Sequence, residues 1–145
     1  RMEGGTGVTA IHPELSPKSR YWIDRHRYYE LKHFCLQYPL WIRARASLDG
    51  LSRRTLRLTP PSPTGLVQSP TSRCAEQRLW YTERIAMVEE SAAEADPLLG
   101  PYLLRGVTEG LSYDCLKARL ALPCSRETYY ESYRKFFWLL SEKRQ

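Results

Sequence analysis

The sequence predicts an all-α protein. Apolar residues recur at intervals of three and four along most of the chain, which is the period of one helix face. Prolines separate these runs, and residues that can cap helices precede several of them. In order, we expect a flexible arm (1–15), an N-terminal helical segment (16–48), a linker (49–70), and a domain (71–145) with a long helix and a helix-turn-helix.

The N-terminal segment is predicted to begin at Ser16 and Pro17, because Ser caps helices and Pro in the first helical position sacrifices no hydrogen bond. Pro39 predicts either a kink or a fresh helix start. The expected apolar face consists of Tyr21, Tyr28, Leu31, Cys35, Tyr38 and Ile42.

Basic residues occupy the rest of this segment. Interleaved with Tyr and Trp, they could grip phosphates or stack on bases, or they could be the solvated side of an amphipathic helix. These residues are Arg20, Arg25, Arg27, Lys32, Arg43 and Arg45.

A change of composition marks the linker over residues 49–70, where four prolines occur with Ser, Thr and Gly. Near its start lies a basic cluster, Arg53, Arg54 and Arg57. In an extended tract such a cluster could follow a nucleic-acid backbone, or it could be an ordinary solvated charge run.

A long helix is expected from Ser69-Pro70-Thr71 to Ala95, about 37 Å in length, with Asp96-Pro97 as its end. A short helix follows at 98–107. Because the long helix exceeds the needs of a small domain, its apolar stripe could pair two copies of the chain, or pack against the N-terminal helix. The stripe consists of Tyr81, Ile85, Val88 and Ala92.

The chain ends in a predicted helix-turn-helix, with helices at 112–121 and 126–143 and a turn at 122–125. Ser112 and Ser125 are expected to cap these helices, and Pro123 cannot continue the first of them. The apolar face of the last helix consists of Tyr129, Tyr133, Phe136, Phe137 and Leu140.

The other side of the last helix is the predicted DNA-binding site, because a helix in the major groove reads base edges near its N-terminus and contacts phosphates further along. Arg126, Glu127 and Tyr130 are the expected base readers, next to Ser125. Arg134 and Lys135 are the expected phosphate contacts, and we expect Arg126, Tyr130 and Arg134 to be exposed. The alternative is a capped helical hairpin with a solvated charged face.

Three stretches resemble phage late transcriptional regulators of the ArpU/RinA type, whose C-terminal part is similar to region 4 of bacterial sigma factors. They are Tyr28-Tyr29-x-Leu31-Lys32-x-Phe34, Ser69-Pro70-Thr71 and Ser125-Arg126-x-Thr128-Tyr129-Tyr130. The resemblance implies an all-helical phage regulator that binds double-stranded DNA. Such modules usually carry an aliphatic residue where this chain has Pro123.

The sequence contains no motif typical of an enzyme: it lacks a Gly-rich phosphate loop, an H-E-x-x-H sequence and a nucleophile elbow. The spacing of Cys35, Cys74, Cys115 and Cys124 fits no zinc site, so we expect reduced cysteines, no metal and no cofactor. No apolar run approaches 18 residues, so we expect an intracellular protein without membrane contact. The resemblance to phage regulators implies that its location is the cytoplasm of the bacterial host cell.

The formal net charge of +6 favours a polyanionic partner. The leading hypothesis is a sequence-specific transcriptional regulator, and a second copy of the chain is one of its expected partners. The alternative is a phage-encoded interaction protein, comparable to anti-CRISPR proteins, that inhibits a host nucleic-acid enzyme. A sequence preference for duplex DNA would separate the two, because an inhibitor needs none.

Overall fold

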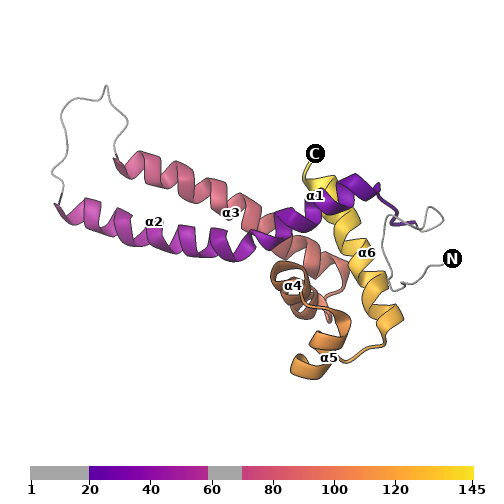
Figure 1. Ribbon diagram of the computed structural model, residues 1–145. Helices are drawn as coiled ribbons and strands as arrows, with labels where there is room; N and C mark the ends of the chain where they lie inside the picture. Colours follow the sequence, from indigo (N-terminus) through magenta and orange to yellow (C-terminus); the bar gives the residue numbers. More distant parts are fainter. Residues whose placement is uncertain (1–19, 59–69) are drawn as a thin grey trace. The chain divides into compact units, whose positions relative to one another are not determined.

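The computed structural model describes residues 20–58 and 70–145, and in these residues the chain forms six α-helices and no strand (Figure 1). The all-α prediction is therefore confirmed. The predicted arm, the Ser16-Pro17 helix start and residues 59–69 of the linker lie outside the described residues. The helices are α1 (Arg25–Leu36), α2 (Tyr38–Leu58), α3 (Pro70–Ala95), α4 (Gly100–Glu109), α5 (Tyr113–Leu120) and α6 (Arg126–Lys143).

The described chain divides into two compact units, and α3 takes part in both. The first unit contains α1, the last part of α3 from Met87 onward, and α4 to α6. The second unit, Tyr38–Ala86, contains α2 and the first part of α3.

In the first unit α4 is the central helix, since it contacts α1, α5 and α6, while α1 also contacts α6. Close packing around α4 depends on two glycines. At Gly100 a Cβ atom would lie 3.2 Å from the carbonyl oxygen of Ala92 in α3. At Gly106 it would meet the hydroxyl of Tyr129 and lie 3.2 Å from Leu116 Cδ1, so both α5 and α6 approach α4 there.

The N-terminal helix begins later than predicted. Arg20 to Asp24 are not helical, and α1 starts at Arg25, where the Asp24 carboxylate accepts a hydrogen bond from the His26 N–H at 2.9 Å. Asp24 was not among the caps predicted from the sequence; its carboxylate also complements the helix dipole, since no acidic residue lies in the first turn of α1. Pro39 is the second residue of α2, so a fresh helix start is confirmed over a kink.

The linker predicted from residue 49 was wrong for its first ten positions, because α2 continues to Leu58. Gly50 costs a helix only about 1 kcal/mol, and the first residue that cannot continue the helix is Pro60. The arginines of the predicted flexible cluster, Arg53, Arg54 and Arg57, therefore belong to a helix.

The apolar stripe of α3 is not a free dimerisation surface. Ile85, Val88 and Ala92 are 2%, 0% and 2% exposed within the single chain, and Tyr81 is half-buried. The prediction that this stripe pairs two copies was wrong for these three residues, because intramolecular packing already removes them from solvent.

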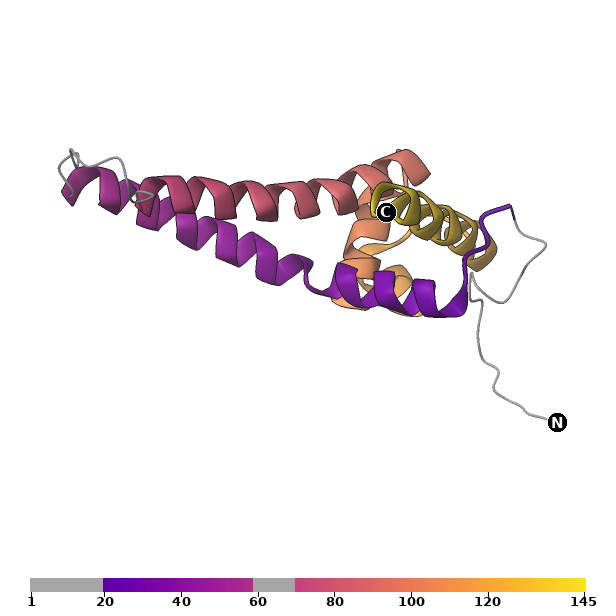
Figure 2. The ribbon, with the colours of Figure 1, turned by 90° about the horizontal axis from the view of Figure 1, so that it is seen from above.

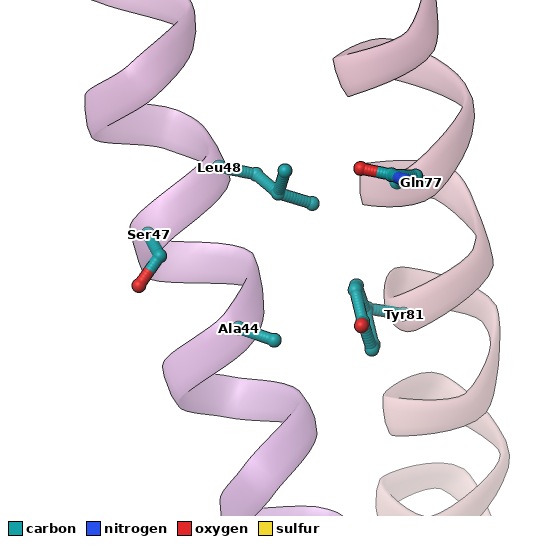
Figure 3. A pocket seen from close by; sticks show the side chains of 5 residues that line it. All are labelled: Ala44, Ser47, Leu48, Gln77 and Tyr81. Atoms are coloured by element: carbon teal, nitrogen blue, oxygen red, sulfur yellow. The ribbon is translucent and has the colours of Figure 1, made fainter.

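In the second unit, α2 and α3 run side by side in opposite directions (Figure 1, Figure 2). Arg45 donates to Thr82 Oγ1 at 3.3 Å, and Arg78 forms an ion pair with Asp49 at 2.6 Å. Between the helices lies an open groove of about 230 Å³, into which Leu48 points from α2 and Tyr81 from α3 (Figure 3). Two polar contacts therefore link α2 and α3 within the second unit.

Candidate nucleic-acid interface

The predicted helix-turn-helix forms from α5 and α6, with both caps as expected. Ser112 Oγ accepts from the N–H of Cys115 at 3.2 Å, and Ser125 Oγ accepts from the N–H of Thr128 at 3.2 Å. Each hydrogen bond satisfies one of the N–H groups left unpaired at a helix start. The short break between the helices is therefore determined by local sequence.

The turn accommodates Pro123 through the residues on either side of it. Ala121 adopts a left-handed conformation with φ 53°, which ends α5 and directs Leu122 into full burial. The Tyr113 hydroxyl donates to the Cys124 carbonyl at 2.7 Å, and Lys117 Nζ donates to the Leu122 carbonyl at 3.0 Å. These two bonds hold the turn against α5.

The apolar face of α6 anchors it in the first unit. Tyr129 is 1% exposed, and Phe136, Phe137 and Leu140 are fully buried, as the period of the sequence predicts. Tyr133 is only half-buried, which corrects the expectation of full burial, because its position at the edge of the face directs its hydroxyl to Tyr28 in α1 at 2.7 Å.

The exposed side of α6 begins with Ser125, Arg126, Glu127 and Thr128. The Ser125 hydroxyl is already used in capping and in a hydrogen bond of 3.0 Å to Thr128 Oγ1, so its place in the predicted site is that of a helix cap. Glu127 is exposed in the first turn, where a carboxylate also complements the helix dipole.

Arg126 is exposed as predicted, but it is held toward α5. It forms an ion pair of 2.8 Å with Asp114, and its guanidinium lies 4.9 Å from the ring centre of Tyr113. An exposed ion pair contributes about 0–1 kcal/mol, whereas a bidentate contact to a base discriminates by about 1–3 kcal/mol. Releasing Arg126 from Asp114 to a base edge is thus energetically accessible.

Two predicted exposures were wrong. Tyr130 is half-buried, with its ring in edge contact with Tyr129 and Tyr133 at centroid distances of 5.0 and 5.3 Å. The Arg134 side chain is 18% exposed and pairs with Glu131 at 3.0 Å. Lys135 is half-buried as well. The burial increases along α6 because its middle packs against α1 and α4, which leaves the N-terminal turn as the accessible part.

The structure brings residues from α5 to the same end that the sequence did not assign to the site. Tyr113 and Asp114 contact Arg126 directly, and Arg119 is exposed further along α5. The only sequence signal for these contacts is the short turn, which must return the start of α6 to α5. The geometry of the turn decides which face of α5 the start of α6 contacts.

The hydroxyls of Tyr129 and Tyr133 on α6 offer no acid–base chemistry near neutral pH. Burial raises the pKa of the Tyr129 hydroxyl, and burial together with the neighbouring Tyr28 raises that of Tyr133 well above its usual value. Both phenols are neutral at physiological pH. All four cysteines are free, and burial raises the pKa of the Cys35 thiol.

Within residues 20–58 and 70–145, no group of three or more His, Cys, Asp or Glu side chains could hold a metal ion. None of the helices in the described part of the chain is long and apolar enough to cross a membrane. No protein-family model, curated protein or solved structure matches this chain.

Proposed function

We propose that the protein is a phage-type transcriptional regulator that binds double-stranded DNA in a sequence-specific way through the N-terminal turn of α6. The observation that supports this most strongly is the division of α6 into two parts. Its middle is buried against α1 and α4, while Arg126, Glu127 and Thr128 remain exposed at its capped start. A recognition helix requires this combination of a rigid support and an accessible N-terminus.

The side chains of that turn suit base reading. Arg126 can donate two hydrogen bonds to guanine O6 and N7, and Glu127 can accept from cytosine N4. Arg119 of α5 and Lys135 of α6 are cations for which no ion pair exists among the described residues, and Arg119 is exposed. They are better placed than Arg134, which is tied to Glu131, to contact the DNA backbone.

The test begins with selection of bound sequences from a random duplex library at about 150 mM salt, where nonspecific binding is weak. A single preferred motif is expected. The Arg126→Ala variant should then lose preference at one base pair, with a discrimination change of about 1–3 kcal/mol, while its affinity for a scrambled duplex is retained.

Arg105→Ala is the matched control, because Arg105 is an equally exposed arginine in a surface ion pair. Its side chain is 48% exposed and pairs with Glu109 at 2.6 Å, compared with 52% exposure for Arg126. This variant should keep the full sequence preference. A library that yields no motif, or a preference unchanged in Arg126→Ala, would refute base reading by α6.

A second candidate is an interaction protein that inhibits a host nucleic-acid enzyme, and the charge pattern of the same surface favours it. Asp114 pairs with Arg126, Glu131 pairs with Arg134, and Glu127 is exposed on the same helix, so this side of α6 is mixed in charge. Mixed charges are typical of a surface that pairs with another protein. This candidate predicts binding to duplex DNA without any preference, or no DNA binding at all.

A further inference from the structure

The solvent side of α1 is basic and aromatic. At 100° per residue, positions 25, 29, 32 and 36 fall within about 60° of one another around the helix axis. We call this set the outer face of α1; its members are Arg25, Tyr29, Lys32 and Leu36. Arg25 is exposed, and Tyr29 and Leu36 are 40% and 38% exposed. The buried residues of α1 lie on its other side: Tyr28, Leu31, Phe34 and Cys35.

The outer face carries no negative charge. Glu30 is the one carboxylate in the sequence of α1, and it pairs with Arg27 at 2.6 Å and with Arg144 at 3.6 Å. Within the described part of the chain, Arg25 and Lys32 form no ion pair. Both cations can therefore bind an anion from outside the chain.

Stabilisation of the helix does not account for Arg25. It is the first residue of α1, where the helix dipole favours an anion, and no acidic residue lies in that first turn. The carboxylate of Asp24, its neighbour in sequence, accepts the capping hydrogen bond from the His26 N–H. An exposed arginine at this position is thus unfavourable for the helix and has no partner that compensates for it.

Tyr29 presents an aromatic ring between the two cations. Along the helix axis Arg25 lies about 6 Å from Tyr29 on one side and Lys32 about 4.5 Å on the other. The Lys32 ammonium lies 5.9 Å from the centre of the Tyr29 ring, and the Tyr28 ring supports that ring at a centroid distance of 5.2 Å. A flat, partly exposed ring with a cation on either side fits a nucleotide base and the phosphates next to it.

We infer that the outer face of α1 binds single-stranded nucleic acid, with a base stacked on Tyr29 and neighbouring phosphates on Arg25 and Lys32. Surfaces that bind single strands combine cations, which contact the backbone, with aromatic rings, on which bases stack. A duplex keeps its bases paired and stacked inside, so a duplex contact would use the cations and leave the ring without a role. An acidic protein would likewise need only the cations.

The contact is separate from base reading by α6 and does not rest on it. Single-stranded DNA and single-stranded RNA offer the same base faces and phosphates. The experiment therefore titrates the full chain with labelled oligodeoxythymidine, oligouridine and a duplex of equal length, using fluorescence anisotropy. Binding of either single strand more tightly than the duplex supports the inference, and the ratio of the two single-strand affinities identifies DNA or RNA as the preferred ligand.

The ring is tested by two substitutions. Tyr29→Leu should weaken single-strand binding roughly 5- to 150-fold, the range for loss of one stacked base, whereas Tyr29→Phe keeps the ring and should stay within about twofold of the parent. Trp80→Leu is the matched control, because Trp80 is 45% exposed and also lies beneath a cation, with the Arg84 guanidinium 3.5 Å from its ring centre. It should leave single-strand binding unchanged.

The cations are tested by the double variant Arg25→Gln/Lys32→Gln in a titration from 50 to 200 mM salt. The slope of log affinity against log salt should fall by about 1.4 units on single strands, as expected for two phosphate contacts. The control Arg73→Gln/Arg105→Gln removes the same charge from two exposed positions and should change the slope by only a few tenths of a unit. This pair of variants also decides the question if Tyr29→Leu does not fold.

Three results would overturn the inference: no binding of either single strand by the parent, equal losses in Tyr29→Leu and Tyr29→Phe, or an unchanged slope in Arg25→Gln/Lys32→Gln. The first would assign the face to a protein partner. The variants of α1 should keep any sequence preference on duplex DNA. If the duplex library yields no motif, reading by α6 fails, and the single-strand titrations still decide the contact on α1.

Discussion

The hydroxyl of Tyr28 in α1 lies 2.7 Å from the hydroxyl of Tyr133 in α6, and this hydrogen bond joins residues 105 positions apart in sequence. Around it the rings of Tyr28 and Phe137 meet edge to face at a centroid distance of 5.1 Å. The Tyr28–Tyr133 pair therefore ties α6 to α1 near the N-terminal side of the described chain.

Tyr133→Phe should lower the free energy of unfolding by about 1 kcal/mol, because it removes one hydrogen bond and keeps the ring. Tyr28→Phe should have a similar effect. Urea denaturation of both single variants and the double variant forms a double-mutant cycle. The double variant should cost less than the two single changes together, and strict additivity would show that the hydroxyls do not interact in solution.

The contact between Gly106 and Tyr129 predicts a destabilising variant and its rescue. Gly106→Ala should cost roughly 1–3 kcal/mol, because the added Cβ meets the buried Tyr129 hydroxyl. Tyr129→Phe alone should be neutral or stabilising, since no hydrogen-bond partner satisfies that hydroxyl within the described structure. The double variant should recover most of the loss in a thermal denaturation experiment. No recovery would mean that the clash involves Leu116 instead.

Arg27 of α1 should stabilise the C-terminal end of α6. Its guanidinium donates to the carbonyl oxygens of Ser141 and Arg144 at 3.0 and 2.8 Å, and to Ser141 Oγ at 3.0 Å. Arg27→Ala is expected to lose roughly 1–2 kcal/mol. Arg27→Lys should restore little, because a single ammonium group cannot reproduce the fork. The measurement is urea denaturation, with Arg25→Ala, an exposed neighbour, as the control; equal losses in both variants would contradict the capping role.

Stability should decrease at alkaline pH. The pKa values of the Tyr129 phenol and the Cys35 thiol are raised by burial from ordinary values of 10.0 and 9.0, so the folded state favours their neutral forms. Their contribution is complete below those ordinary values and is lost as pH rises above them. Each group accounts for up to about 1.4 kcal/mol per pH unit.

Urea titrations at pH 8, 9.5 and 11 test this prediction. Tyr129→Phe should flatten the decline above pH 10, and Cys35→Ala should flatten it from about pH 9. A parent protein equally stable at all three values would show that these groups are accessible to solvent in the folded state.

Local chemistry made much of the fold predictable. Ser112 and Ser125 were identified as caps because capping depends on a hydrogen bond between residues three apart. The buried face of α6 followed from the helical period of Tyr129, Phe137 and Leu140. The end of α2 was predicted too early. The proline-rich composition around Pro60 was taken to begin at residue 49, although residues 49–58 still have helical spacing.

The sequence by itself determined that the chain is helical, that Ser112 and Ser125 cap α5 and α6, and which residues stand at the start of α6. Only the tertiary structure decided that Arg126 pairs with Asp114, that the Arg134 side chain is largely covered, and that Ile85 and Val88 are buried by packing within the single chain. The physical reason is that these features act over different separations in the sequence. Capping and periodicity act within a few residues, whereas burial and ion pairing depend on which neighbours the packing supplies, such as Tyr28 beside Tyr133 across 105 positions.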